Sequence, residues 1–510
     1  MIQMLKKIPH KYLLLIIVVQ RLFDISGGFD VFGQTGGTIG SVNWELDGFG
    51  SLTFSGTGDL HEKFTEYSVF DGLLDDVEQI YVGLNISSIG SNAFSRCPKV
   101  KIVYIGTDVT DIHYDAFRNN TTLLYISVVP DNPSYYDYSG MLIQKSNNML
   151  AICPQAQKGI CLVPEMVEVI GSYAFRDCIG LNSVILPSEL KRIDHYAFYN
   201  CGVHTLTLTG SEIHLGFDAF YGCKNLVSFH LPKILSTIGN PFGNCESLES
   251  IIVDDNDSGF KSIDGVVFSK DGKLLLFYPS GRKGEYTIPE GVTYIGSSSF
   301  YTCNNLTRII LSPTVETISG NAFSFCNSLK SLAISPSVTK IDYNVLDQCP
   351  NVSEIICFSP VPPKLVSGSF SSDLLNNGVL RVPAALMDSY IGAEEWMKFQ
   401  NIEPLQDEIE MDYAEKYVMN GGTMSLKAAI TGGAANPNVV LLSSSNPEVA
   451  TIDSKGKLTA INPGTTVITA SIDEEEVECR VTVIAKGKLF IENAGEQVER
   501  VKLYENECCD

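Results

Sequence analysis

Basic residues are scarce in this chain of 510 residues. Lysine and arginine number 36 against 59 aspartate and glutamate residues, and the formal net charge at pH 7 is −23. Nucleic-acid binding requires a basic face for the phosphate backbone, so we expect no nucleic-acid partner. The acidic balance instead predicts a solvated exterior that keeps an elongated protein soluble.

A long apolar run is missing as well. Near the start of the chain, residues 12–19 are apolar, whereas a membrane-spanning helix needs about 20 such residues. We therefore expect no transmembrane helix. The run follows three lysines and precedes small residues at 26–28, which resembles a secretory signal. We predict that residues 1–28 are a signal or leader segment of an exported protein, an atypical one because Arg21 and Asp24 interrupt it.

Catalytic signatures are also absent from the sequence. It has no His-Glu-x-x-His, no Gly-x-Ser-x-Gly and no phosphate-binding glycine-rich loop. The seven histidines are scattered along the chain. We therefore predict a protein that is not an enzyme and that uses no cofactor or metal. Residues 254–259, Asp-Asp-Asn-Asp-Ser-Gly, faintly resemble a calcium loop, but Gly265 stands where such a loop has its glutamate, so we predict a solvated turn.

Cysteine pairs with metal-binding spacing are missing, although the chain has 14 cysteines. Eight of them occupy one position of a repeat, which holds Asn120 in another copy: Cys97, Cys178, Cys201, Cys223, Cys245, Cys303, Cys326 and Cys349. Stacked coils lie about 4.8 Å apart, beyond the usual Cβ separation in a disulfide of about 3.5–4.5 Å. We predict an inward column of buried free thiols that meet the loop backbone.

A motif of 22 to 23 residues recurs nine times. Its phenylalanine falls at Phe94, Phe117, Phe175, Phe198, Phe220, Phe242, Phe300 and Phe323, with Leu346 in the ninth copy. Each copy joins a turn-forming half to a strand half in which apolar residues alternate. Such a strand cannot bury its apolar face alone, so neighbouring coils must stack. We predict a mostly β solenoid with one coil of about 23 residues per copy.

Two insertions break this spacing, after Val128 and after Val253. The long units that contain them match at a constant offset of 125 residues without a gap. A repeated insertion is a structured element, and we predict a hairpin in each, for example from strands at 265–268 and 274–278.

Two cysteines of the first insertion replace two tyrosines of the second. Cys153 and Cys161 correspond to Tyr278 and Tyr286. A joint replacement indicates that the two positions face each other. We predict that Cys153 and Cys161 are close, either as a disulfide in an exported chain or as a buried pair of thiols.

Other segments flank the array at 89–358. Residues 37–88 predict an N-terminal β cap, and residues 359–405 predict a C-terminal cap with a strand at 379–382 and a helix at 384–391. Residues 406–485 carry short alternating runs between turn signals, which predicts a small Ig-like β-sandwich. Its expected strands are 439–443, 449–453, 457–460 and 466–471. Residues 486–510 are a short tail, with a further strand expected at 489–492.

One column of strand residues is predicted to point outward from the sheet. It contains Tyr104, Ser127, Ile185, Thr207, His230, Ile252, Ile310, Ala333 and Ile356. Its large apolar members, which are candidate binding residues, are Tyr104, Ile185, Ile252, Ile310 and Ile356. On an extended sheet they would form a stripe about 50 Å long, and such stripes often mark a partner surface. The alternatives are that β-branched residues merely suit strands, or that the insertions cover the stripe.

The repeat, Ile-Gly-Ser-x-Ala-Phe-x-x-Cys-x-x-Leu-x-x-Ile-x-Leu-Pro, closely resembles the BspA-like leucine-rich repeats of bacterial surface proteins. Residues 444–453, Ser-Ser-Asn-Pro-Glu-Val-Ala-Thr-Ile-Asp, resemble the bacterial immunoglobulin-like group 2 domain. These resemblances imply an exported, surface-attached protein whose repeats bind an extracellular protein or glycan. The group 2 domain would act as a stalk or accessory module.

Three functions compete at this point. An adhesin would use the outward column of the repeat sheet to recognise its partner. A structural spacer would have no ligand of its own. A polymer hydrolase would need a catalytic triad or a metal, for which the sequence gives no candidates. No oligomeric state is predicted.

Overall fold

The computed structural model describes residues 35–61, 70, 72–208, 213–231, 234–237, 239–254, 257, 259–405, 408–411, 414–426, 428–431, 441–472 and 475–485. The predicted leader at 1–28 and the tail at 486–510 lie outside the described residues. The chain forms two compact units. The first extends to Arg308 and includes residues 317–329 and 342–351, and the second holds residues 309–316, 330–341 and those from Val352 on.

Each copy of the motif forms one coil of a solenoid. In one copy, β14 (Val169–Ile170) leads through turns at 171–180 into β15 (Leu181–Ile185). Val184 and Leu186 are buried and Ile185 between them is exposed, because successive strand residues point to opposite faces. The predicted mostly β solenoid is confirmed.

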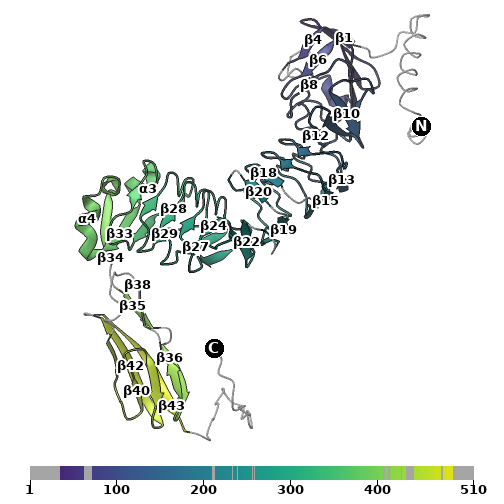
Figure 1. Ribbon diagram of the computed structural model, residues 1–510. Coiled ribbons are helices and arrows are strands. Elements are labelled where there is room, and N and C mark those ends of the chain that lie inside the picture. The colour runs from purple at the N-terminus through teal and green to yellow at the C-terminus, as the bar shows by residue number, and fades with distance from the viewer. Residues whose placement is uncertain are drawn as a thin grey trace, which may run out of the picture. The chain divides into compact units, whose positions relative to one another are not determined.

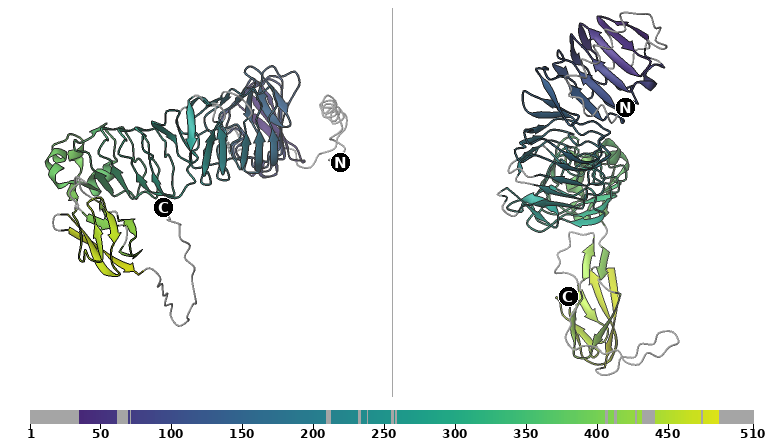
Figure 2. Two further views of the ribbon diagram at one scale, coloured as in Figure 1. Left: turned by 60° about the horizontal axis from the view of Figure 1, so that its bottom comes forward. Right: turned by 90° about the vertical axis from the view of Figure 1, so that its right-hand side faces the viewer.

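Parallel strands form ladders on two sides of the first unit. One side carries three sheets. The first has the order β1 (Thr35–Ile39), β2 (Val42–Leu46), β3 (Ser51–Gly56), β5 (Gln79–Val82), β7 (Ile102–Ile105) and β9 (Tyr125–Val128). The second consists of β13 (Gly159–Leu162), β15 and β17 (Thr205–Thr207), and the third of β19 (Ser228–Leu231) and β21 (Ser250–Val253). Strands β1 to β3 are antiparallel and join the parallel ladder at β5. The right-hand view of Figure 2 shows these purple strands side by side.

The second side carries shorter strands. They are β4 (Gly58–Leu60), β6 (Ile86–Ile89) and β8 (Asp111–Ile112), and then β12 (Met149–Ile152), β14, β16 (Arg192–Ile193), β18 (Ile213–Leu215) and β20 (Ile234–Thr237). Figure 1 shows β18 and β20 on the opposite side of the coils from β13 and β15. A 3-10 helix, η3 (Leu74–Asp76), precedes β5.

The motif phenylalanines stack inside the array. Phe175, Phe198 and Phe220 are fully buried, with ring centroids 4.6 and 5.2 Å apart. The turns around them need left-handed backbone two residues before and after the phenylalanine, as at Tyr173 (φ 60°) and Asp177 (φ 55°). Asparagine, aspartate and glycine favour this conformation, which explains their recurrence there.

Each insertion adds a three-stranded antiparallel element. The first consists of β10 (Tyr135–Tyr138), β11 (Met141–Gln144) and β12, and the second of β22 (Phe260–Ile263), β23 (Val266–Ser269) and β24 (Leu274–Phe277). The predicted hairpin is confirmed, with an additional strand before it. Three consecutive side chains of β11 are buried. Leu142 packs into the core on one side, and Met141 and Ile143 pack into the core on the other, so β11 divides the hydrophobic core.

After each insertion the array resumes. In the first unit β25 (Gly284–Thr287), β26 (Tyr294–Ile295) and β28 (Thr317–Ile318) continue it, and β27 (Leu306–Ile310) passes from the first unit into the second. The second unit holds β29 (Ser331–Ile334), β31 (Glu354–Cys357), β33 (Val379–Pro383) and β34 (Asn401–Leu405) in one ladder, and β30 (Lys340–Ile341) beside β32 (Lys364–Leu365) in another.

The ladder of the second unit ends against short helices. They are α3 (Ser372–Asn377), η4 (Ala384–Leu386), α4 (Met387–Ile391) and η5 (Trp396–Lys398). The predicted helix at 384–391 is thus a 3-10 turn followed by a short α-helix. Trp396 and Phe399 are buried there.

The C-terminal module has mainly antiparallel sheets around its own core, with β36 parallel to β43 (Figures 1 and 2). Its strands are β35 (Glu408–Met411) with β38 (Ala428–Thr431), then β36 (Glu415–Met419), β43 (Glu475–Ile484), β42 (Gly464–Ile472) and β39 (Leu441–Ser444), and β37 (Thr423–Ser425), β41 (Lys457–Ala460) and β40 (Ala450–Ile452). Ile468, Cys479 and Val481 are fully buried between the sheets. The long β43 was not predicted.

Candidate functional site

The five candidate binding residues lie on strands of one side of the array. They are Tyr104 on β7, Ile185 on β15, Ile252 on β21, Ile310 on β27 and Ile356 on β31. Ile185 and Ile252 are 40% and 43% exposed, and the other three are half-buried. Neighbouring column members are in register, as Tyr104 is opposite Ser127. The column therefore exists, but its exposure is uneven.

The sheet that carries this column is divided, because the insertions interrupt it, as one of the alternatives anticipated, and binding by the column stays a prediction. After β9, the main-chain N–H of Ile126 donates to the carbonyl of Gly140 in the first hairpin at 2.9 Å. The N–H of Ile251 donates in the same way to the carbonyl of Gly265 in the second hairpin at 2.9 Å. These hairpins occupy the hydrogen-bonding edge where the next array strand would pair.

Two strongly exposed aliphatic residues lie on one strand of the first insertion, beside a column residue. On β13, Ile160 is 68% and Leu162 is 60% exposed, while Cys161 between them is buried. Leu162 pairs directly with Ile185 of β15. We call Ile160, Leu162 and Ile185 the β13 patch. Sequence analysis missed Ile160 and Leu162 because β13 lies outside the strict copies of the motif.

The second long unit provides an internal comparison. At the constant offset of 125 residues, Ile160 and Leu162 correspond to Glu285 and Thr287, which are also exposed. Glu285 Oε2 lies 3.9 Å from Nη1 of Arg308. Two strand positions of the same architecture are therefore apolar in the first long unit and charged or polar in the second long unit. The backbone does not require the apolar side chains.

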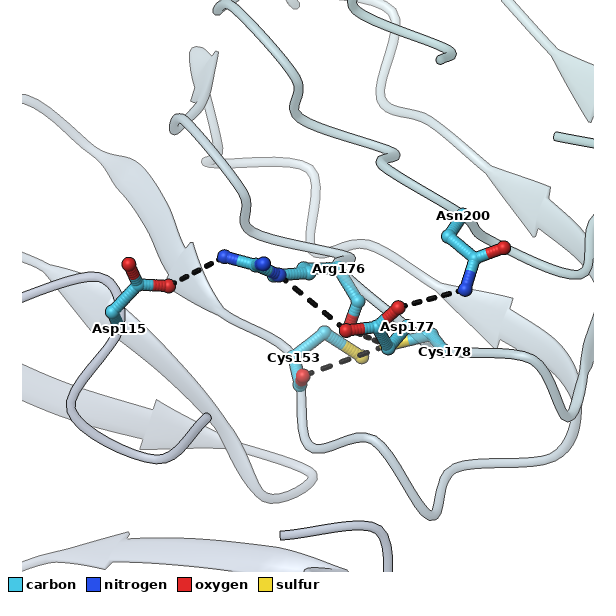
Figure 3. Close-up of polar contacts among 6 residues, drawn as sticks. All are labelled: Asp115, Cys153, Arg176, Asp177, Cys178 and Asn200. Atoms are coloured by element: carbon cyan, nitrogen blue, oxygen red, sulfur yellow. Dashed lines mark hydrogen bonds and ion pairs between the residues drawn. The ribbon is translucent and has the colours of Figure 1, made fainter. Parts of the chain in front are cut away.

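The turn side of the coils stays continuous across the first insertion (Figure 3). Arg176 Nη1 lies 2.7 Å from Oδ1 of Asp115, a residue 61 positions earlier, and its Nε lies 3.4 Å from Oδ2 of Asp177. Asn200 of the next coil donates to Asp177 Oδ1 at 2.8 Å. The side chains of Arg176 and Asp115 are mostly buried, so this pair links successive coils rather than offering a free charge.

Tyrosines line this turn side, and sequence analysis did not single them out. Tyr114 stacks on Tyr173 at 5.0 Å, Tyr173 stacks on Tyr196 at 5.3 Å, and Tyr199 stacks on Tyr221 at 5.4 Å. Because their ring faces cover one another, they stabilise the stack of coils. Most of them lie two residues before or one residue after the motif phenylalanine, so a comparison of the copies at these two positions would have found them.

A buried carboxylate lies among these rings. Asp218 is 1% exposed, and burial raises its pKa to about 7, although hydrogen bonds from Tyr196 and the Gly243 N–H act in the opposite direction. Within the part of the chain that the structure describes, its Oδ1 has no hydrogen-bond partner. We therefore expect this group to make the stability of the fold depend on pH.

The repeat cysteines are free, and all except the half-buried Cys349 are buried, as expected. Cys223, Cys245 and Cys326 donate from Sγ to the carbonyls of Phe198, Phe220 and Phe300, each at 3.2 Å. Cys178 donates to the carbonyl of Cys153 at 3.6 Å (Figure 3). Burial raises the pKa of Cys201 to about 12, so this thiol stays protonated and unreactive.

Asn120 departs from the expectation for this column. It is fully buried, but neither amide atom forms a hydrogen bond with the described residues. The backbone contact predicted for this copy is therefore missing.

Cys153 and Cys161 are buried and free. Their side chains are joined by a hydrogen bond, which together with burial raises the pKa of Cys161. The corresponding Tyr278 and Tyr286 have ring centroids 4.6 Å apart. The two positions thus face each other, and a disulfide between the cysteines stays a prediction.

The described residues contain no group of three or more His, Cys, Asp or Glu side chains placed to hold a metal ion. Asp257, in the segment that faintly resembles a calcium loop, is 4% exposed, so the prediction of a solvated turn is wrong for this residue. None of the helices among the described residues has the length and apolar character needed to cross a membrane.

Comparison with known proteins identifies both parts of the chain. The model of the BspA type leucine-rich repeat region matches residues 63–139, 158–274 and 276–377, more than half of the chain. The model of the bacterial Ig-like domain (group 2) matches residues 407–483. A search of curated proteins found no match.

Several solved structures are similar at low identity. A leucine-rich cell surface protein from Faecalibacterium prausnitzii is 20% identical, with 72% of this chain and 94% of that chain covered and a TM-score of 0.40. The pneumococcal vaccine antigen PcpA is 16% identical, with 72% and 97% covered and a TM-score of 0.35. A leucine-rich repeat protein from Bacteroides ovatus is 19% identical, with 72% and 100% covered and a TM-score of 0.29.

The repeat match agrees with the stacked coils, the phenylalanine ladder and the cysteine column. The chain belongs to the BspA-type leucine-rich repeat proteins and carries a C-terminal group 2 bacterial Ig-like domain.

Proposed function

We propose that this protein is a non-enzymatic adhesin, exported to the cell surface, that binds an extracellular protein through the β13 patch. The observation that carries the proposal is the apolar exposure of Ile160 and Leu162 where the second long unit has Glu285 and Thr287. An exposed apolar cluster that the fold does not require marks a partner surface.

The chemistry of the patch favours a protein over a glycan. Its side chains are aliphatic, and they offer neither hydrogen bonds for hydroxyl groups nor an aromatic face. Burying one such side chain against a partner contributes about 1.5–3 kcal/mol. Three adjacent residues can therefore form the centre of an interface, provided that polar contacts around them exclude water. The group 2 domain would hold the array away from its attachment point.

The test places the residues of the second long unit at the equivalent positions of the first. The full chain and the double variant Ile160→Glu/Leu162→Thr are applied to immobilised matrix proteins, mucins and glycans. We expect saturable binding to a protein by the parent chain and at least a tenfold loss of affinity in the variant. Because Glu and Thr occupy the equivalent strand in the second long unit, the variant should fold normally, which its thermal unfolding would verify.

A matched control changes the equivalent strand of the second long unit instead. Glu285→Gln/Thr287→Ser should leave binding unchanged. Equal affinity of the parent and the Ile160→Glu/Leu162→Thr variant would refute binding through the β13 patch. A folded parent chain that binds nothing on the panel would favour a structural spacer without a ligand of its own.

A further inference from the structure

The outer face of the first sheet carries a pair of tyrosines. Tyr81 of β5 lies opposite Tyr104 of β7, and Tyr104 lies opposite Ser127 of β9. All three are half-buried and point away from the core, because the residues beside them, such as Ile80 and Val103, are fully buried. Tyr81 extends the predicted outward column by one strand. Sequence analysis missed it because β5 precedes the strict copies of the motif.

The two tyrosine rings form a stack that ends at Tyr104. Their centroids are 4.5 Å apart and their planes differ by 4°. One face of the Tyr104 ring is therefore covered by Tyr81, and no other ring of the described residues lies against it. The next residue of the column is Ser127, whose side chain is too short to cover the second face of this ring. The stack thus has an open end above Ser127.

Hydrogen-bonding groups surround this open end. The Tyr81 hydroxyl donates to Oε1 of Gln79 at 3.0 Å, which orients the Gln79 amide, and no described residue accepts from its Nε2. Tyr125, diagonal to Tyr104 on β9, is 46% exposed. A Cβ added at Gly140 would lie 2.7 Å from Cδ1 of Tyr125, so this ring rests against the first hairpin. Amide and hydroxyl groups both donate and accept, as the hydroxyls of a sugar require.

Charge around this face distinguishes between kinds of sugar. Burial raises the pKa of Tyr81 and the charge of Asp47 contributes to the shift, so Asp47 lies near that ring. Beside Ser127, Oδ1 of Asp137 accepts from the N–H of Val128 at 2.8 Å. Both carboxylates, and the net charge of −23, would repel the sialic acid or sulfate groups of acidic glycans. The face therefore suits a neutral sugar.

The size of the face also favours a sugar over a protein. An aromatic side chain buries about 150–250 Å², whereas a stable protein interface takes about 800 Å² from each partner. One open ring face with polar groups around it matches the dimensions of a single pyranose ring.

We propose that this face binds a neutral hexopyranose of an extracellular glycan, which stacks on Tyr104 above Ser127. The C–H bonds on one side of a pyranose carry partial positive charge and pack against the negative face of an aromatic ring. Gln79, Tyr125 and Ser127 would hydrogen bond to the sugar hydroxyls and fix its orientation. This site is separate from the β13 patch, which is proposed to bind a protein through aliphatic side chains.

The experiment applies soluble albumin conjugates to the immobilised full chain. The conjugates carry terminal β-galactose, β-N-acetylglucosamine or α-mannose, with sialylated and unconjugated albumin as controls, and their many copies compensate for weak binding of one sugar. We expect saturable binding of at least one neutral conjugate, with competition by the free methyl glycoside of the same sugar. Binding of no neutral conjugate, or a preference for the sialylated one, would overturn the proposal.

Two variants test the site from opposite directions. Tyr104→Thr, which introduces the residue type of Thr207 in the same column, removes the stacking face and should lower the affinity for the sugar at least tenfold. Ser127→Tyr should extend the ring stack and cover the open face, so it should abolish sugar binding without lowering the thermal unfolding temperature. Sugar binding that survives Ser127→Tyr would contradict the assignment.

A matched control is Tyr294→Thr. Tyr294 is 45% exposed, but it lies on β26, among the shorter strands, so this change should leave sugar binding unchanged. The variant Ile160→Glu/Leu162→Thr separates this proposal from the proposed function, because it should lose the protein partner and keep the sugar. Sugar binding that is lost in that variant but survives Tyr104→Thr would place the sugar on the β13 patch and overturn the proposal.

Discussion

A repeat position has the same surroundings in every coil, so a residue that departs from the pattern lacks the contacts that the other copies make. The position of the inward repeat cysteines shows this. Cys223 and its counterparts donate to the carbonyl of the preceding coil, whereas Asn120 buries two polar atoms without partners among the described residues. A larger polar group has replaced a small weak donor at a place that cannot satisfy it.

We therefore predict that Asn120→Cys stabilises the array. The gain should be about 1–3 kcal/mol, the penalty of leaving a buried polar group unpaired. Urea denaturation of the full chain would measure it. The reverse change in the preceding coil, Cys97→Asn, should destabilise by a similar amount, and an unchanged transition in both variants would contradict this account.

Asp218 links stability to pH. Burial raises its folded-state pKa from 3.8 to about 7, so the folded chain holds a proton that the unfolded chain releases. Its contribution to stability is complete below the unfolded-state pKa and is lost as pH rises through the folded-state pKa. The full difference is on the order of 4 kcal/mol.

The test is denaturation at about pH 5 and about pH 8, on either side of the folded-state value. The parent chain should lose stability at the higher pH. Asp218→Asn should remove most of this loss, because asparagine tolerates the left-handed backbone (φ 51°) and carries no charge. The same pH dependence in both proteins would show that other groups control it.

Cys153 and Cys161 give a redox prediction. The two face each other in a buried site, and an exported protein meets an oxidising environment. We predict a disulfide between them in protein secreted from cells, detected as a linked peptide by mass spectrometry without reduction. The repeat cysteines serve as the internal control and should be recovered unlinked. Recovery of Cys153 and Cys161 as unlinked thiols would favour the buried pair.

Among the structural elements, the phenylalanine ladder packs successive coils against one another. Phe198 is fully buried, and its ring stacks between those of Phe175 and Phe220. Phe198→Ala should destabilise the first unit by about 3–5 kcal/mol through lost burial and an unfilled cavity. Phe325→Ala, at a ring that is 37% exposed, should cost much less. Similar losses in chemical denaturation would contradict the ladder's role.

The insertions act differently on the two sides of the coils. On the sheet side, hairpins hydrogen bond to β9 and β21 and end each ladder. On the turn side the coils remain in contact, through Arg176 and Asp115 at the first insertion and through Asn240, which donates to the carbonyl of Ser298 at 3.1 Å, at the second. The sheet side is therefore divided into short segments.

Most of the fold could be predicted because a strict period leaves few alternatives. Burial of Phe198 and of the repeat cysteines follows from the alternation of apolar residues and the stacking of coils alone. The exposure of Ile160 and the burial of Asp257 could not be predicted, because both depend on how an insertion packs against neighbouring coils. The offset of 125 residues contained the contrast of Ile160 with Glu285, but a pairwise difference acquires meaning only once its surroundings are known.

For the whole molecule, the central claim is that binding of a protein partner is local to the β13 patch rather than spread along the array. It implies that apolar residues of one column differ in function although they share a repeat position. Ile185 belongs to the patch, whereas Ile252 and Ile356 lie on other strands, β21 and β31.

The most direct test compares three single variants of the full chain, Ile185→Asp, Ile252→Asp and Ile356→Asp, on the same panel of matrix proteins, mucins and glycans. We predict at least a tenfold loss of affinity for Ile185→Asp and little change for the other two. Equal losses in all three would restore the continuous stripe and contradict the account, and unchanged binding in all three would place recognition elsewhere.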